Sequence, residues 1–235
     1  MRTLFLLLAL SAGLMANEIY IASGAGYKRA ISELSTAFEQ KTQMKVNQIY
    51  GNMQQISEQI KYSDKIAVFV GDEDFIKKLK IDYSQKIELG MGSLVLVFSK
   101  NHQNVSGIEA LSLETIKKIG LPDTQKTIYG KAADEFLNHA NLHHTLKNKL
   151  NVFQAAPQVS SYLVSGDLDA GFINKSDYLG IKQNVGKMIE IEKNLYSPIK
   201  IIGVVLSGRQ SPQTDALIEF LSSDKAKNIL NEQGL

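Results

Sequence analysis

The sequence predicts an α/β protein built from two lobes, each a doubly wound sheet with helices on both faces. Short apolar strands alternate with amphipathic helices along the chain, and three β-turn-α units follow one another between residues 18 and 79. A second α/β set lies between two strong later strands. Continuous apolar strands separated by helices indicate parallel sheets that are covered on both faces.

The first unit begins with a strand over Glu18–Ala22, which runs into two closely spaced glycines, Gly24 and Gly26. From Tyr27, apolar residues recur at helical spacing to about Thr42, which predicts the first helix. The same criteria predict strands at Met44–Tyr50 and Ile66–Val70, and helices at Met53–Ile60 and Asp74–Leu79.

The second set lies between strands predicted at Ser93–Ser99 and Lys200–Ser207. We expect two lobes joined by two crossover strands: a first lobe over residues 17–92 and 203–235, and an inserted second lobe over residues 93–202. The elements expected inside the inserted lobe are helices near Leu113–Ile119, Tyr129–Leu150 (broken near Asn141) and Pro157–Ser165, and strands near Val152 and Ala170–Ile173. The chain should end with helices over Gln213–Leu221 and Asp224–Glu232.

The first sixteen residues predict a cleavable export signal. Arg2 precedes an apolar run from Leu4 to about Leu14, and the small Ala16 suits a cleavage position. This run is shorter than the ~20 residues that a membrane-spanning helix needs. The chain has no cysteine, so no lipid can be attached to one. We therefore expect a freely soluble, exported protein, located in the periplasm of a two-membrane bacterium.

Composition excludes several classes of function. Hydrophobic residues make up 44% of the chain and charged residues 21%, as in ordinary globular proteins. The formal net charge is only +2 and no basic run is present, which argues against a nucleic-acid partner. Without cysteine there are no disulfides, thiolate metal sites or cysteine nucleophiles. We expect a monomer.

The best candidates for a binding site are the starts of four helices. The first amides of a helix have no partner within the helix, and the glycines within Ser23–Tyr27 allow close approach of a ligand. Equivalent helix starts are predicted at Gly51–Gln54, Ile128–Gly130 and Ala155–Pro157. Turn geometry alone can explain any one of them, but four at one cleft favour a small oxyanion held by uncharged donors.

Other chemistries lack their motifs. Neither glycine-rich phosphate-binding fingerprint is complete, and no G-x-S-x-G is present. His139 and His143 have metal-site spacing but no accompanying H-E-x-x-H carboxylate, so we interpret them as surface residues. The acidic clusters at residues 72–74 and 167–169 are interpreted as helix caps and turns. No catalytic residue, metal or cofactor is predicted, and we expect no enzyme.

The order of short motifs resembles the molybdate-binding proteins of ABC importers, within the two-lobed periplasmic binding proteins of type II fold. The resemblance covers nearly all of the chain after the signal. It implies a non-enzymatic protein that closes over a small anion, molybdate or tungstate first, and docks on an inner-membrane permease. It rests on Ile19–Phe38, Gln59-Ile60, Ala67–Val70, Tyr129–Ala132, Gly166–Phe172, Leu195–Ile199, Phe220–Ala226 and Gly234.

The resemblance also implies where a ligand is held. The family's first Ser or Asn falls at Gly26, its second serine at Met53, and its tyrosine at Asn174, so three hydroxyl positions are altered. Main-chain donors from the inserted lobe fall at Tyr129 and Ala156. The complete set of predicted binding residues is Gly24, Ala25, Gly26, Tyr27, Asn52, Met53, Gln54, Tyr129, Ala156 and Asn174.

Three alternatives remain open. The altered pocket positions are compatible with a paralogue remodelled for another small anion or an organic acid. A ligand-sensing subunit of a membrane receptor would have the same fold. An exported enzyme would need a nucleophile–base pair, which we do not find.

Overall fold

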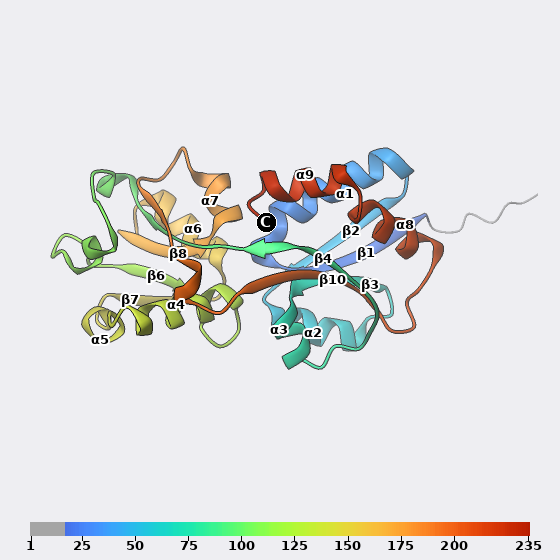
Figure 1. Cartoon of the computed structure of the whole chain (residues 1–235), viewed down its shortest axis with the longest axis horizontal. Helices are drawn as coiled ribbons and strands as arrows, with labels where there is room; N and C mark the ends of the chain where they lie inside the picture. The colour runs from blue at the N-terminus through green and yellow to red at the C-terminus, as the bar shows by residue number, and fades with distance from the viewer. Residues whose placement is uncertain (1–16) are drawn as a thin grey trace, which may run out of the picture.

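The computed structural model describes residues 17–235 and consists of two α/β lobes lying end to end (Figure 1). Each lobe is built on one five-stranded sheet with helices packed against it. The predicted two-lobed α/β fold is therefore confirmed. The predicted export signal, residues 1–16, lies outside the described residues. Within residues 17–235, no helix is long and apolar enough to cross a membrane.

The sheet of the first lobe has the strand order β2-β1-β3-β10-β4. Strands β1, β2 and β3 are parallel, whereas β10 is antiparallel to both of its neighbours. The strands are Glu18–Gly24 (β1), Lys45–Gly51 (β2), Ile66–Asp72 (β3), Tyr83–Gly92 (β4) and Ile199–Leu206 (β10).

Helices cover both faces of this sheet (Figure 1). One face carries α1 (Lys28–Thr42), α8 (Pro212–Leu221) and α9 (Asp224–Glu232), and the other carries α2 (Met53–Tyr62) and α3 (Glu73–Lys78). A 3₁₀ turn, Ala25–Tyr27 (η1), leads from β1 into α1.

The sheet of the second lobe has the order β7-β6-β8-β5-β9. Strands β6, β7 and β8 are parallel, and β5 is antiparallel to β8 and β9. The strands are Leu94–Phe98 (β5), Ile119–Pro122 (β6), Leu150–Phe153 (β7), Ala170–Asn174 (β8) and Met188–Glu190 (β9). The helices are Ile128–His139 (α4), His143–Leu146 (α5), Ala156–Ser165 (α6) and Lys175–Ile181 (α7), with 3₁₀ turns at Lys100–His102, Ile108–Ser112 and Lys193–Leu195.

The amphipathic pattern explains how α1 packs. Its apolar positions, spaced three and four residues apart, form one buried face against the sheet. On this face Phe38 meets Phe220 of α8 with ring centroids 5.6 Å apart, which joins the N-terminal unit to the C-terminal helices. The helix ends at Thr42, and the C-cap residue Gln43 that follows has a left-handed conformation (φ 61°).

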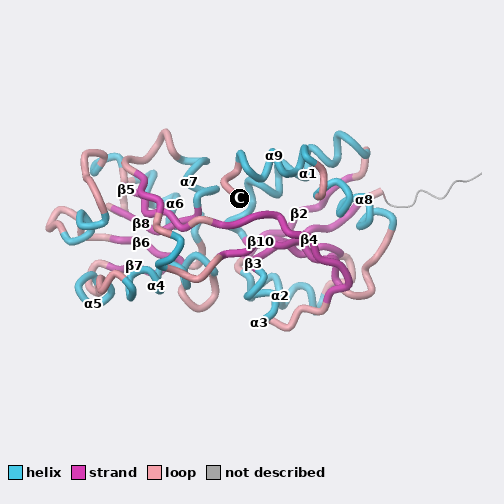
Figure 2. The backbone as a smooth tube through the Cα atoms, in the orientation of Figure 1, coloured by secondary structure: helices cyan, strands magenta, loops and turns pink. Residues whose placement is uncertain are grey.

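Two adjacent segments join the lobes (Figure 2). One is the step from Gly92 at the end of β4 through Ser93 to Leu94, and the other is the segment that enters β10 at Ile199. Gly92 pairs with Ile199, and the Leu94 N–H donates to the Tyr196 hydroxyl over 3.1 Å. All of β10 lies in the first sheet; the lobe boundaries at residues 92/93 and 202/203 stay a prediction.

One predicted helix is wrong. The segment Leu113–Ile119 is not helical: a 3₁₀ turn precedes it, and Ile119 is the first residue of β6. The i, i+3 spacing of its apolar residues imitates a helix. The structure instead holds this segment by the Asp169 carboxylate, which accepts hydrogen bonds from Lys117 N–H (2.7 Å) and Lys118 N–H (2.9 Å). A long-range contact therefore decides the local conformation.

Four other elements differ from the prediction, and one of them is strand β9, for which no strand was predicted. The predicted helix from Tyr129 to Leu150 does break near Asn141, which has a positive φ of 56°, but Leu150 belongs to strand β7. Strand β4 was not predicted: half of its residues are exposed, and its first four, Tyr83–Lys86, are polar. Helix α7 is only seven residues long, and its start is capped by the Asn174 side chain.

Candidate ligand-binding site

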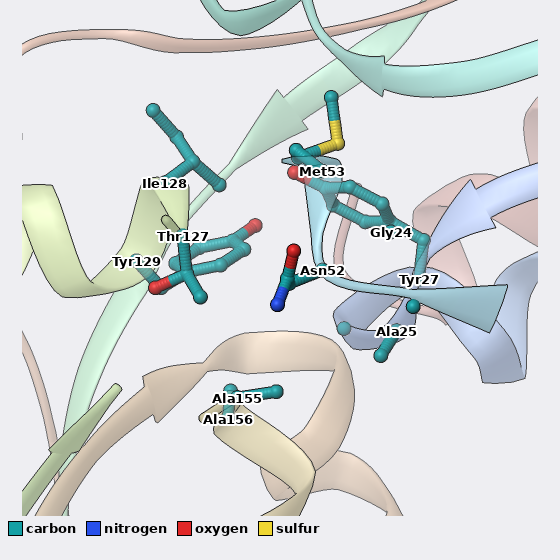
Figure 3. Close-up of a pocket in the computed structure, with 12 residues that line it drawn as sticks. Gly24, Ala25, Tyr27, Asn52, Met53, Thr127, Ile128, Tyr129, Ala155 and Ala156 are labelled. Atoms are coloured by element: carbon teal, nitrogen blue, oxygen red, sulfur yellow. The ribbon is translucent and has the colours of Figure 1, made fainter. Parts of the chain in front are cut away.

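The starts of four helices line a small cavity between the lobes (Figure 3). In the first lobe, parallel pairing puts Gly24 opposite Gly51, so the turns after β1 and β2 meet at one sheet edge. In the second lobe the starts of α4 and α6 face them. The cavity has a volume of about 40 Å³. It is lined by Gly24, Ala25, Gly26, Tyr27, Gly51, Asn52, Met53, Thr127, Ile128, Tyr129, Ala155 and Ala156.

The four helix starts differ in how their free amides are satisfied. Asn52 caps α2 by accepting from the Gln55 N–H (2.9 Å), and Thr127 caps α4 by accepting from the Gly130 N–H (3.0 Å). No side chain caps the turn after β1 or the start of α6 at Ala155. The turn after β1 therefore has no side chain that occupies its amides. At the start of α6 the amide of Ala156 is the free one, because Pro157 has no N–H and the Gln158 N–H donates to the Ala155 carbonyl oxygen (3.1 Å).

The lining of the cavity is uncharged. Among residues 17–235, the twelve that line it include no lysine, arginine, aspartate or glutamate. A volume of about 40 Å³ is small for a ligand site. The cavity therefore suits a compact ligand that accepts several hydrogen bonds and needs no countercharge.

Two tyrosines, one from each lobe, meet at the cavity. The rings of Tyr27 and Tyr129 are tilted by 58° with centroids 6.2 Å apart, and both side chains are almost fully buried. The buried Met53 side chain packs beside Tyr27, in a slot that exists because Gly71 has no side chain. These three residues give the cavity an apolar wall.

Gly26 allows the lobes to approach each other closely. A Cβ atom at Gly26 would lie 2.8 Å from Asn174 Nδ2 of the second lobe, which is too close for contact. Asn174 cannot move aside easily, because its Oδ1 accepts from the Asp177 N–H (2.6 Å) and its Nδ2 donates to the Asp177 carboxylate (2.9 Å). Glycine is required here for close approach between the lobes.

Two buried carboxylates lie behind the cavity wall. Burial raises the pKa of Asp72 to about 6 and that of Asp177 to about 7, although both carboxylates accept hydrogen bonds and Arg29 lies near Asp177. Both are near enough to raise the pKa of Tyr27, although burial is the largest cause of that rise. Their ionised forms therefore place negative charge close to the cavity.

All but two of the predicted binding residues line the cavity. Gln54 lies instead in an adjoining open groove, with Lys126 and Gln154 of the other lobe. Asn174 is buried behind Gly26 and caps α7. The Asn52 oxygen is used as a helix cap, although its side chain points into the cavity (Figure 3). The role of these residues in binding a ligand stays a prediction.

Four lining residues are absent from the predicted binding set. Gly51, Ile128 and Ala155 belong to the predicted helix starts but were not singled out. Thr127 was overlooked, although a threonine immediately before an apolar helical pattern is a typical N-cap signal.

The other candidate sites have structural roles. His139 Nδ1 lies 2.8 Å from the Leu195 carbonyl oxygen, and His143 Nε2 lies 3.2 Å from the Asp134 carboxylate. The part of the chain that the structure describes holds no cluster of three or more His, Cys, Asp or Glu suited to a metal ion. Asp72 caps α3 by accepting from the Phe75 N–H (2.9 Å), as predicted for this acidic cluster.

Two lobes with a cavity of helix-start donors between them define a two-lobed solute-binding protein. The sequence profile of the family described as bacterial extracellular solute-binding protein matches residues 19–235, and the chain belongs to this family. Proteins of this family bind solutes for ABC importers; they are not enzymes and carry no cofactor.

Individual proteins support the same assignment. The chain is 25% identical over 241 residues to the molybdate-binding protein of Azotobacter vinelandii, covering 97% of this chain and 96% of the relative. The solved periplasmic molybdate-binding protein of Azotobacter vinelandii matches with a TM-score of 0.82 at 20% identity, covering 92% of this chain and 97% of that one. The resemblance to molybdate-binding proteins is thereby confirmed.

A third match is the L-phospholactate-bound structure of PEB3, a protein of Campylobacter jejuni. Its TM-score is 0.72 at 16% identity, and the match covers 92% of this chain and 98% of that one. At this identity the match establishes the fold alone.

A side chain at Gly26 should prevent ligand binding. We expect Gly26→Val to fold but to lose any thermal shift that a small anion causes in the wild type, because the new Cβ would collide with Asn174 and hold the lobes apart. Gly26→Ala should weaken the shift, and adding Asn174→Ala should restore part of it by removing the collision. Unchanged affinity of Gly26→Val in calorimetry would contradict this role.

Burial of Asp177 predicts a specific dependence of stability on pH. Because the folded-state pKa lies above the ordinary value of 3.8, the folded protein loses stability as pH rises toward 7. Asp177→Asn should remove this loss, stabilising the protein at pH 8 by at most about 4 kcal/mol and by less than half as much at pH 5.

Thermal unfolding of wild type and variant at the two pH values measures this difference. Asp82→Asn changes an exposed carboxylate and serves as the control. A Tm change in Asp177→Asn that is equal at both pH values would show that the effect is not one of charge.

Proposed function

We propose that this protein is the periplasmic solute-binding component of an ABC importer and that its solute is a small oxyanion, with molybdate or tungstate as the first candidates. The observation that carries the proposal is the pair of uncapped helix starts that face each other, one from each lobe, across an uncharged cavity of about 40 Å³. The similarity to molybdate-binding relatives supports the same ligand class.

Binding would work by closure of the lobes. Donors from both lobes can contact the anion together only when the cavity is closed, so the anion binds the closed form more tightly and shifts the population toward it. The closed monomer would then dock on a permease in the inner membrane, where opening of the lobes releases the anion. Uncharged donors suit this cycle, because no ion pair has to be broken at release.

A small organic acid is the second candidate. Met53 occupies the position of a family serine, and its side chain, Ile128 and the two tyrosine rings make part of the wall apolar. A ligand with a phosphate or carboxylate head and a short carbon chain would use both kinds of surface. The fold shared with the L-phospholactate-bound protein is compatible with this candidate. The small volume of the cavity favours the inorganic anion.

A thermal-shift panel tests the proposal. The panel contains molybdate, tungstate, sulfate, phosphate and L-phospholactate. A ligand at about a thousand times its Kd stabilises the folded state by about 4 kcal/mol, which for a protein of this size raises Tm by roughly 8–16 °C. We expect such a shift with molybdate and tungstate.

The controls separate the candidates. The Gly26→Val variant should show no shift with any anion, which identifies the cavity as the site. A shift with L-phospholactate but not with molybdate or tungstate would replace the first candidate by the second. No shift with any member of the panel would refute oxyanion binding.

A further inference from the structure

Apart from each other, the hydroxyl groups of Tyr27 and Tyr129 have no hydrogen-bond partner in the protein. Among residues 17–235, six buried side-chain oxygens lack such a partner, and only these two belong to residues that line the cavity. Both tyrosines are 2–3% exposed, so neither hydroxyl is satisfied by bulk solvent. A buried hydroxyl without a partner loses its hydrogen bonds to water and gains none in return, so two of them at one place indicate a missing acceptor.

The two hydroxyls cannot satisfy each other completely. They contact each other closely enough for a weak hydrogen bond to affect the pKa of both, but the contact does not meet full hydrogen-bond geometry. Even if a small rotation joined them, one O–H would donate and the other would still lack an acceptor. At least one donor therefore remains for a ligand.

Both hydroxyls are donors at physiological pH. Burial raises the pKa of both phenols well above the ordinary value, and the nearby Asp72 and Asp177 raise it further. The groups are therefore neutral O–H donors rather than phenolates, which would repel an anion. In Figure 3 the Tyr27 and Tyr129 side chains converge from opposite lobes on the same region of the cavity.

We propose that the Tyr27 and Tyr129 hydroxyls are the side-chain donors that hold the bound oxyanion, one from each lobe, and that they determine its affinity. This inference rests on the proposed function. The resemblance to molybdate-binding proteins puts Gly26 and Met53 where family members have hydroxyl or amide side chains. The two phenols restore two neutral O–H donors to the same cavity from other positions. Because each lobe supplies one of them, a bound anion bridges the lobes.

Removing each hydroxyl while keeping the ring tests the proposal. Tyr27→Phe and Tyr129→Phe retain the aromatic contact between the lobes, and both should fold with a ligand-free Tm equal to or above that of the wild type. Calorimetry with molybdate should show affinity reduced roughly 10- to 100-fold in each variant, and further in the double variant, as expected for lost hydrogen bonds to a charged ligand. Tyr178→Phe, outside the cavity, should bind as the wild type does.

A spectroscopic measurement separates ligand contact from a structural effect. The chain has no tryptophan, so tyrosine dominates its near-ultraviolet absorption. Molybdate should change the tyrosine spectrum of the wild type and of Tyr178→Phe, and the change should vanish in the Tyr27→Phe/Tyr129→Phe double variant.

The outcomes distinguish this inference from the proposed function. Wild-type binding of molybdate together with affinity within threefold in both single variants would overturn the role of the hydroxyls and leave the proposed function standing. If the wild type binds L-phospholactate instead, the same variants are measured with that anion and the same limits apply. Failure of the wild type to bind any anion of the panel would overturn both.

Discussion

The first amides of an α-helix have no partner within the helix, and this constraint shapes the centre of the molecule. Parallel strands that lead directly into helices bring several such starts to one sheet edge, and the two lobes turn those edges toward each other. Asn52 and Thr127 cap two of the helix starts, whereas the turn after β1 and the start of α6 at Ala155 have no side-chain cap. The cavity is thus a product of backbone architecture, which side chains only refine.

The buried carboxylates behind the cavity wall disfavour an anion in the cavity. Asp72 and Asp177 are buried close to the tyrosine rings, and both have a raised pKa because burial disfavours their ionised forms. An anion entering the cavity adds a further negative charge nearby and favours protonation of these groups. The uncharged donors at the cavity attract an anion, whereas the buried carboxylates behind its wall repel one. The repulsion limits the affinity for an anion. A carrier that must deliver its ligand benefits from such a limit.

Local sequence was sufficient for the parts of the fold that local physics controls. The glycines around residue 25, the periodicity of α1 and the apolar run of β3 each indicate their own conformation, and together they locate most of the cavity. Strand β4 could not be predicted, because its conformation depends on pairing with β10, which is distant in sequence. The segment before Ile119 could not be predicted either, because hydrogen bonds to the Asp169 carboxylate hold it. The meeting of Tyr27 and Tyr129 likewise depends on how the lobes pack, which no short stretch of sequence encodes.

The absence of charged side chains from the lining of the described cavity also bears on the medium in which the protein works. Mobile ions weaken attraction between exposed charges beyond a Debye length of about 8–10 Å at moderate ionic strength, and basic recognition sites lose affinity accordingly. Peptide and phenol dipoles act over a few ångströms inside a space from which such ions are excluded. If the solute is an anion, as proposed, its capture should therefore be nearly the same in fresh and in saline water.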